Sequence, residues 1–178
     1  MKKSLSVLVA ITLNLSLSAQ EKVANKLFYS EYGGPGVIMS ADFDSRFKTN
    51  ERLGFGFRLG AGFGIGEFYD QQPNQWGYNE YVTRTYYTIP AGLNYVFGKS
   101  DSAKTFELGA GVTFLTRKVS LFYYYNNDKP GNIIGFLTFM YRTMPIDGGF
   151  SWRIGLTPII GTSGDLYPMV AAGFGYVF

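Results

Sequence analysis

The feature that most constrains the fold is a strict alternation of residue size in RLGFGFRLGAGFGIG, residues 52–66. Side chains of a β-strand point in turn to opposite faces, so this period of two gathers every large apolar residue on one face. An α-helix cannot keep the register, because its period is 3.6 residues. The segment therefore predicts a strand with one bulky apolar face and one face of glycine and arginine.

The same alternation recurs along the chain. It is present at residues 36–47, 82–98, 104–117, 149–160 and 170–178, and less regularly at 132–144. The connections between these segments are short near 48–51, 99–103 and 145–148, long at 67–81 and 118–131, and intermediate at 161–167. This pattern predicts an antiparallel meander whose long loops gather at one end.

Two kinds of barrel are built from such strands, and they differ in which face is inside. A soluble barrel encloses its apolar face around a ligand, whereas a membrane barrel turns that face to lipid. The interior of an eight-stranded barrel is only wide enough for side chains to fill it, so bulky faces from every strand do not fit there. Glycines facing water would weaken a strand without benefit. We therefore expect the apolar faces outside, in lipid.

The number of strands follows from parity, because single-chain outer-membrane barrels normally have an even number. Residues 26–32, KLFYSEY, followed by the turn-rich sequence GGPG at 33–36, can add an eighth strand to the seven clear ones. These seven residues are fewer than the 9–11 expected for a membrane span. One long strand bent at 33–36 is thus an open alternative for residues 26–47. The expected fold is all-β, an eight-stranded antiparallel up-and-down transmembrane β-barrel.

The first twenty residues, MKKSLSVLVAITLNLSLSAQ, have the pattern of a secretory signal peptide. Lys2 and Lys3 precede an apolar run from about Leu5 to Leu17, and small residues lead to a cleavage site after Ala19. An uncleaved anchor is the alternative, but the run is short and interrupted by polar residues. We expect residues 1–19 to be removed and residues 20–178 to form one barrel domain in the bacterial outer membrane. Loss of two lysines lowers the net charge from +3 to +1, so no nucleic-acid partner is inferred.

Charged residues fall on the small faces of the predicted strands. A lysine or arginine facing lipid at mid-membrane would cost roughly 2–4 kcal/mol, whereas inside a barrel it can pair with an opposite charge. We predict an ion-pair network that fills the lumen, with a path for protons or ions as the alternative. The predicted members are Asp42, Asp44, Arg46, Arg58, Glu107, Arg142 and Arg153.

Aromatic residues are concentrated near strand ends and in the two long loops. Near the strand ends, interfacial girdles are expected from Tyr86, Tyr87, Tyr141, Trp152 and Tyr176, with a sugar-binding platform as the alternative. In the loops, either contact with an external ligand or packing of loop on loop is expected for Tyr69, Trp76, Tyr78, Tyr123, Tyr124 and Tyr125.

The segments YSEYGGPGVIMSADFDSRF, IPAGLNYVFGK and FSWRIGLTPII, together with the aromatic C-terminus, resemble a known family. It comprises the small outer-membrane β-barrel proteins of diderm bacteria, mostly uncharacterised, and the resemblance covers residues 24–178. In that family the terminal strand is read by the barrel-assembly machinery, which the matching Phe174, Tyr176 and Phe178 would imply here. The resemblance implies a fold and a location and is nearly silent about activity.

Histidine and cysteine are both absent from the chain, which removes the commonest general base, disulfides, thiolate metal sites and a lipidated cysteine anchor. Barrel enzymes of similar architecture that cleave or modify lipids or proteins use a histidine. We therefore expect no enzymatic activity, no cofactor and no metal. An enzyme without histidine, using a pair such as Asp42 and Glu107, is the least favoured alternative.

An open, porin-like channel needs about 16 strands, so eight leave no aqueous lumen. We expect a filled barrel with a structural or surface-binding role through loops 67–81 and 118–131. The alternative is a carrier, or a narrow path, for a small ligand or ion through the lumen. The expected partners are outer-membrane lipid, the barrel-assembly machinery during biogenesis and an unidentified external ligand, and the expected state is a monomer.

Overall fold

The computed structural model of the chain describes residues 23–69, 81–119 and 130–178. The predicted signal peptide and the loop aromatics Trp76, Tyr78 and those at 123–125 lie outside the described residues. The elements are β1 (Lys26–Gly33), the 3₁₀ turn η1 (Gly34–Gly36), β2 (Met39–Arg46), β3 (Gly54–Tyr69), β4 (Tyr81–Gly98), β5 (Lys104–Val119), β6 (Gly131–Thr143), β7 (Gly149–Leu156), β8 (Ile159–Ile160), β9 (Leu166–Tyr167) and β10 (Val170–Val177). No helix among these residues is long and apolar enough to cross a membrane.

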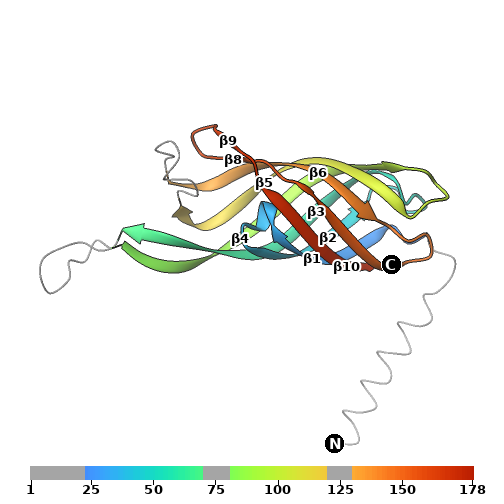
Figure 1. The fold of residues 1–178 in the computed structure, drawn as a ribbon, viewed down its shortest axis with the longest axis horizontal. Helices are drawn as coiled ribbons and strands as arrows, with labels where there is room; N and C mark the ends of the chain where they lie inside the picture. The colour runs from blue at the N-terminus through green and yellow to red at the C-terminus, as the bar shows by residue number, and fades with distance from the viewer. Residues whose placement is uncertain (1–22, 70–80, 120–129) are drawn as a thin grey trace, which may run out of the picture.

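The strands form a closed antiparallel barrel (Figure 1). Each of β1 to β6 pairs with the next strand in the chain, and β10 closes the barrel by pairing with both β7 and β1. The short β8 continues the line of β7 beyond Thr157 and Pro158 and pairs with β6, and β9 pairs with β8. Eight strands therefore make the wall, which confirms the predicted all-β, eight-stranded, up-and-down barrel.

Residues 26–47 form two strands and not one bent strand. β1 pairs with β2 antiparallel from Lys26 opposite Ser45 to Tyr32 opposite Met39. The reversal between them depends on Gly33 and Gly34, whose φ angles of 74° and 63° are readily available only to glycine. The predicted segment 36–47 starts later, at Met39, because the turn extends to Ile38.

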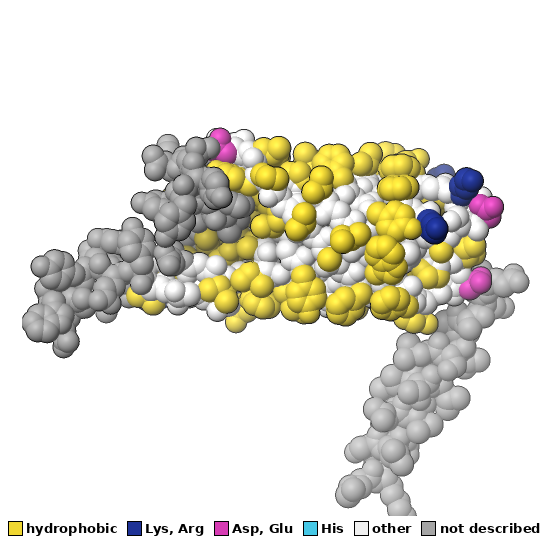
Figure 2. All heavy atoms as spheres, in the orientation of Figure 1, with side chains coloured by type: hydrophobic (Ala, Val, Ile, Leu, Met, Phe, Trp, Pro, Cys, Tyr) yellow, Lys and Arg dark blue, Asp and Glu magenta, His cyan; other side chains and the backbone are white. Residues whose placement is uncertain are grey.

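The barrel is apolar outside and polar inside, the reverse of a water-soluble protein. Phe55 and Leu59 on the outer face of β3 are 66% and 51% exposed, whereas Arg58 between them is 2% exposed. Figure 2 shows hydrophobic side chains over the visible wall, with charged groups towards its ends. The predicted assignment of the two faces to outside and inside is thus the one that the fold adopts.

Tyr86 is an exception to the predicted aromatic girdles. Its neighbour Tyr87 points outward and is 66% exposed, but Tyr86 is buried in the lumen. Strand register explains the correction, because Tyr86 shares the inward face of β4 with Thr88 and its ring lies against Gly64 of β3. The period of two along β4 therefore accounts for the inward position of Tyr86, whereas its proximity to a strand end does not.

Candidate functional site

Eight charged side chains form a continuous series of ion pairs through the lumen, which we call the charge ladder. Acidic and basic groups alternate along it, and all eight are buried. Four carboxylates balance four guanidiniums, so the ladder carries no net charge. In spatial order its members are Asp42, Arg58, Glu31, Arg153, Glu107, Arg142, Asp44 and Arg46.

One half of the ladder is organised around Glu31 of β1. Arg58 Nη2 donates to Glu31 Oε1 and to Asp42 Oδ1, both at 2.9 Å. Asp42 also accepts a hydrogen bond from Ser40 Oγ at 2.5 Å. Arg153 Nε lies 3.0 Å from Glu31 Oε2. Residues from four different strands, β1, β2, β3 and β7, are thereby fastened to one another across the lumen.

The other half continues from Glu107 of β5. Its carboxylate accepts from Arg153 Nη2 at 3.0 Å and from Arg142 Nη1 at 2.7 Å. Arg142 Nη2 lies 3.3 Å from Asp44 Oδ1, and the same oxygen accepts from Arg46 Nη2 at 2.5 Å. Asn94 of β4 accepts from Arg46 Nη2 at 2.7 Å and donates to Asp44 Oδ2. The ladder and Asn94 together therefore contain at least one charged or amide group from every strand from β1 to β7.

Glycines on the small faces make room for these long side chains. A Cβ added at Gly56 would meet the guanidinium of Arg46, and one at Gly60 would meet the carboxylate of Asp42. The two glycines stand opposite these residues in the β2–β3 register. At these two positions the alternation seen in the sequence is thus a packing requirement of the lumen, because a larger residue would displace a member of an ion pair.

The structure places all seven predicted network residues in the charge ladder. Glu31 is the eighth, and sequence reasoning missed it. It lies in the short segment 26–32, where the inward face also carries Leu27 and Tyr29, so neither face of the segment is small. Glu31 pairs opposite Gly173 of β10, which leaves space for its carboxylate. This pairing between distant strands cannot be read from the local sequence.

Tyr29 lies between two guanidiniums of the ladder. Its ring centroid is 4.6 Å from Arg153 Cζ and 5.6 Å from Arg58 Cζ, so both cations face an aromatic ring. The Tyr29 hydroxyl, Arg58 Nη1 and Arg153 Nη1 have no hydrogen-bond partner among the described residues. Such buried polar groups commonly bind interior waters.

The β1–β2 connection folds into the lumen and fills it on the long-loop side of the ladder. We call residues 33–38 the inner turn; its residues Gly34, Pro35 and Gly36 are all buried. Thr88 Oγ1 of β4 donates to Gly36 O at 3.1 Å, and Thr113 Oγ1 of β5 donates to Pro35 O at 2.9 Å. Val37 has a φ of 76°, a strained conformation for a β-branched residue.

Two apolar clusters flank this polar interior. Towards the short turns, Leu27, Val96, Met144 and Val177 pack together, and towards the long loops Phe136, Ile134, Leu115 and Ile159 do so. At the short-turn end Arg52 donates to Ser100 O at 3.0 Å, to Ser102 O at 2.8 Å and to Met144 O. Burial lowers the pKa of Arg52 from its ordinary value. Side chains and one turn thus fill the lumen at several levels.

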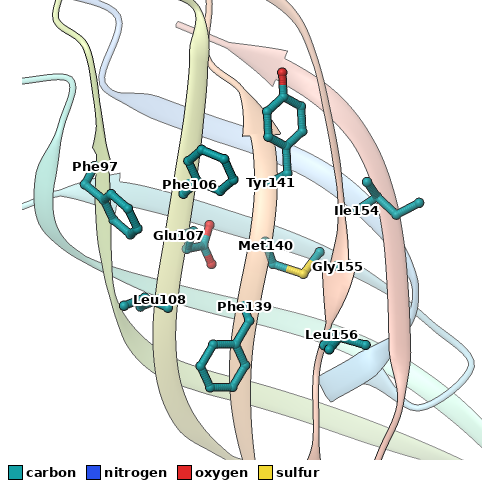
Figure 3. Close-up of a pocket in the computed structure, with 10 residues that line it drawn as sticks. All are labelled: Phe97, Phe106, Glu107, Leu108, Phe139, Met140, Tyr141, Ile154, Gly155 and Leu156. Carbon is teal, nitrogen blue, oxygen red and sulfur yellow. The ribbon is translucent and has the colours of Figure 1, made fainter.

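The outer wall carries a shallow apolar groove of about 310 Å³ across β5, β6 and β7, with Phe97 of β4 at its edge (Figure 3). It crosses the β6–β7 seam, where only four residue pairs are in register. The groove is lined by Phe97, Phe106, Glu107, Leu108, Phe139, Met140, Tyr141, Ile154, Gly155 and Leu156. Glu107 is buried and its carboxylate is bound inside the lumen, so the surface offered by the groove is almost entirely apolar.

The remaining predicted residues lie apart from the lumen. Phe174 and Tyr176 point outward on the closing strand β10, Phe178 follows it directly, and all three are more than half exposed. Tyr69 ends β3, and its side chain is not among those described. Within the described residues no three acidic, histidine or cysteine side chains are grouped so that they could hold a metal ion.

Chemically, the ladder is suited to holding the wall together. The carboxylates of Asp42 and Glu107 are each bound by a guanidinium and are buried, so a substrate outside the barrel does not reach them. Comparison with known proteins gives no match, because no protein-family model, curated protein or solved structure is sufficiently similar to the chain. The fold and the site define the protein as an eight-stranded β-barrel with an ionic interior, and the family resemblance of its segments stays a prediction.

Proposed function

We propose that the protein is an outer-membrane β-barrel with a filled lumen, which serves as a rigid support for its long loops. The observation that carries this proposal is the distribution of charge over the wall. Among the strand residues whose side chains the structure describes, the exposed charged ones lie near the strand ends, at Lys26, Arg84, Lys104, Arg117 and Lys118. Between them the outward residues are apolar or uncharged, as a surface in contact with lipid requires.

A belt of aromatic rings near the short turns supports the same proposal. On one side the ring contacts link Phe47, Phe57, Phe43 and Phe178, with centroids 6.0–6.5 Å apart. On the other side they link Phe55, Tyr95, Phe97, Phe106, Tyr141 and Trp152. Aromatic girdles at this level are typical of membrane barrels, in which the short turns face the periplasm.

The role that we propose is structural or surface-binding and not enzymatic. The lumen is occupied by the ladder and the inner turn, which leaves the loops at 67–81 and 118–131 as the parts of the chain able to vary without cost to the core. Most of both loops lies outside the described residues. The absence of histidine from the chain supports a non-catalytic role.

A second candidate is a narrow path for protons or small ions. The continuity of the charge ladder favours it, because buried ionisable groups within a membrane often mark such paths. The N–H groups of Arg58 and Arg153 that have no hydrogen-bond partner in the described part of the chain provide further sites for water along the same line.

Cell fractionation and gel migration test the main proposal. The mature protein is expected in the outer membrane, beginning at Gln20, and the unboiled protein is expected to migrate differently from the boiled protein on a gel. Replacement of residues 70–80 and 120–129 by short turns should leave this heat-modifiable migration intact and abolish surface binding. Recovery of the mature protein from the soluble periplasm would refute the proposal.

A further inference from the structure

The outer groove lies beside a distinctive arrangement of three outward rows on β5, β6 and β7. The row nearest the short turns consists of Lys104, Thr143 and Trp152. The second row consists of Phe106, Tyr141 and Ile154, and the third of Leu108, Phe139 and Leu156. The groove lies among the second and third rows, and Lys104 therefore stands at its end nearest the short turns.

The lining determines what kind of molecule the groove can hold. A polar group placed among these apolar side chains would lose its hydrogen bonds to water without replacement. A peptide strand could not dock by main-chain pairing either, because β5, β6 and β7 already pair with one another there. The occupant must therefore be a hydrocarbon chain along its buried part.

The size of the groove and the polar groups at its end restrict the possible occupants further. A volume of about 310 Å³ is at the lower limit for small-molecule sites, whereas a second protein copy needs about 1,000 Å² or more of total buried surface. Figure 3 shows the Tyr141 hydroxyl directed away from Phe139, out of the groove. An exposed ammonium at Lys104 beyond that hydroxyl is complementary to an anionic head group.

We infer that the groove binds one acidic phospholipid, with an acyl chain between the second and third rows and its phosphate at Lys104. This inference rests on the proposed membrane location. It adds a specific site to a wall that otherwise meets bulk lipid, and it places the bound molecule in the leaflet nearest the short turns. The short β6–β7 seam is thereby covered by the lipid where its strand pairing is limited to four residue pairs.

Tryptophan fluorescence offers a direct test, because the chain has only two tryptophans. Trp76→Phe leaves Trp152, whose ring centroid lies 5.3 Å from that of the groove residue Tyr141. The variant is reconstituted in phosphatidylcholine vesicles that contain either brominated phosphatidylglycerol or brominated phosphatidylcholine as the quencher. Relative affinities at Trp152 follow from the quenching curves, and we expect about fivefold preference for phosphatidylglycerol, since one interfacial lysine contributes about that factor.

Matched variants distinguish lipid binding at the groove from a general effect of surface charge. Lys104→Gln should bring the two lipids to nearly equal affinity. Lys26 begins β1 as Lys104 begins β5, near the short turns, and Lys26→Gln should keep the preference for phosphatidylglycerol. Leu108→Phe fills the groove and should also reduce the preference, while Leu59→Phe on the outer face of β3 should not. Equal quenching by both lipids, or equal losses from Lys104→Gln and Lys26→Gln, would overturn the inference and leave the membrane location standing. Absence of quenching by either brominated lipid would instead overturn the membrane location itself.

Discussion

At the scale of single residues, Arg58, Arg142 and Arg153 of the ladder each neutralise carboxylates from two other strands, whereas Arg46 pairs with Asp44 of its own strand. Arg58 is a clear example, because among the described residues Asp42 has only Ser40 as a further partner and Glu31 has only Arg153. A buried carboxylate left without its cation is costly, typically by about 3–5 kcal/mol, whereas an intact buried pair contributes much less to net stability. The intact ladder is thus expected to add little net stability, whereas the loss of one member is expected to be costly.

Arg58→Met is therefore expected to lower the free energy of unfolding by about 3–5 kcal/mol. Urea unfolding in detergent micelles or lipid vesicles, followed by tryptophan fluorescence, measures the change. Lys118→Met, at an exposed position near the end of β5, is the control and should change the stability by less than about 0.5 kcal/mol. Equal effects of the two substitutions would contradict the ion-pair account of the lumen.

Two substitutions at Tyr29 separate the contributions of its ring and of its hydroxyl to the free energy of unfolding. Because its hydroxyl has no partner among the described residues, Tyr29→Phe should change the unfolding free energy by less than about 1 kcal/mol. Tyr29→Leu removes the ring that faces Arg58 and Arg153 and should cost about 1–3 kcal/mol more. The same unfolding assay compares them, and a loss in Tyr29→Phe as large as in Tyr29→Leu would show that the hydroxyl is bound.

At the scale of elements, the inner turn shows where reasoning from the sequence succeeded and where it stopped. The sequence GGPG marked a turn, and alternation assigned the inward residues of β2 to β7 correctly. The direction of the turn, into the lumen, depends on hydroxyls 52 and 78 residues away in the chain, which no local pattern reveals. The same limit applies to Glu31, because its place in the ladder depends on pairing between β1 and the distant β10.

Removal of both threonine hydroxyls should loosen the inner turn without opening the barrel. In Thr88→Val combined with Thr113→Val, two hydrogen bonds to the turn are lost, each contributing about 0.5–1.5 kcal/mol. Amide hydrogen exchange at Val37, which donates to Gly34 O at 2.9 Å, should accelerate roughly fivefold or more. Thr105→Val is the control, because the buried Thr105 hydroxyl donates to Arg142 O and does not touch the turn. Equal acceleration in the control would contradict the proposed attachment.

At the scale of the whole molecule, the fold combines an apolar exterior with an interior blocked by ions, a turn and apolar clusters. Porin-sized conductance is therefore not expected when the protein is reconstituted in planar bilayers. Arg58→Met should not produce it either, because the inner turn and both apolar clusters remain in place. Large, stable conductance steps in the unaltered protein would contradict a filled lumen.

The central claim is that the apolar wall faces lipid, and site-directed spin labelling tests it most directly. The chain has no cysteine, so a single cysteine can be introduced at one position at a time without background. Labels on the outward residues Ile89, Leu93 and Leu108 should, in lipid vesicles, be highly accessible to oxygen and poorly accessible to a water-soluble nickel complex. A label at Asp101, in a short turn, should show the reverse. High nickel accessibility at the three wall positions in the folded, reconstituted protein would contradict the account.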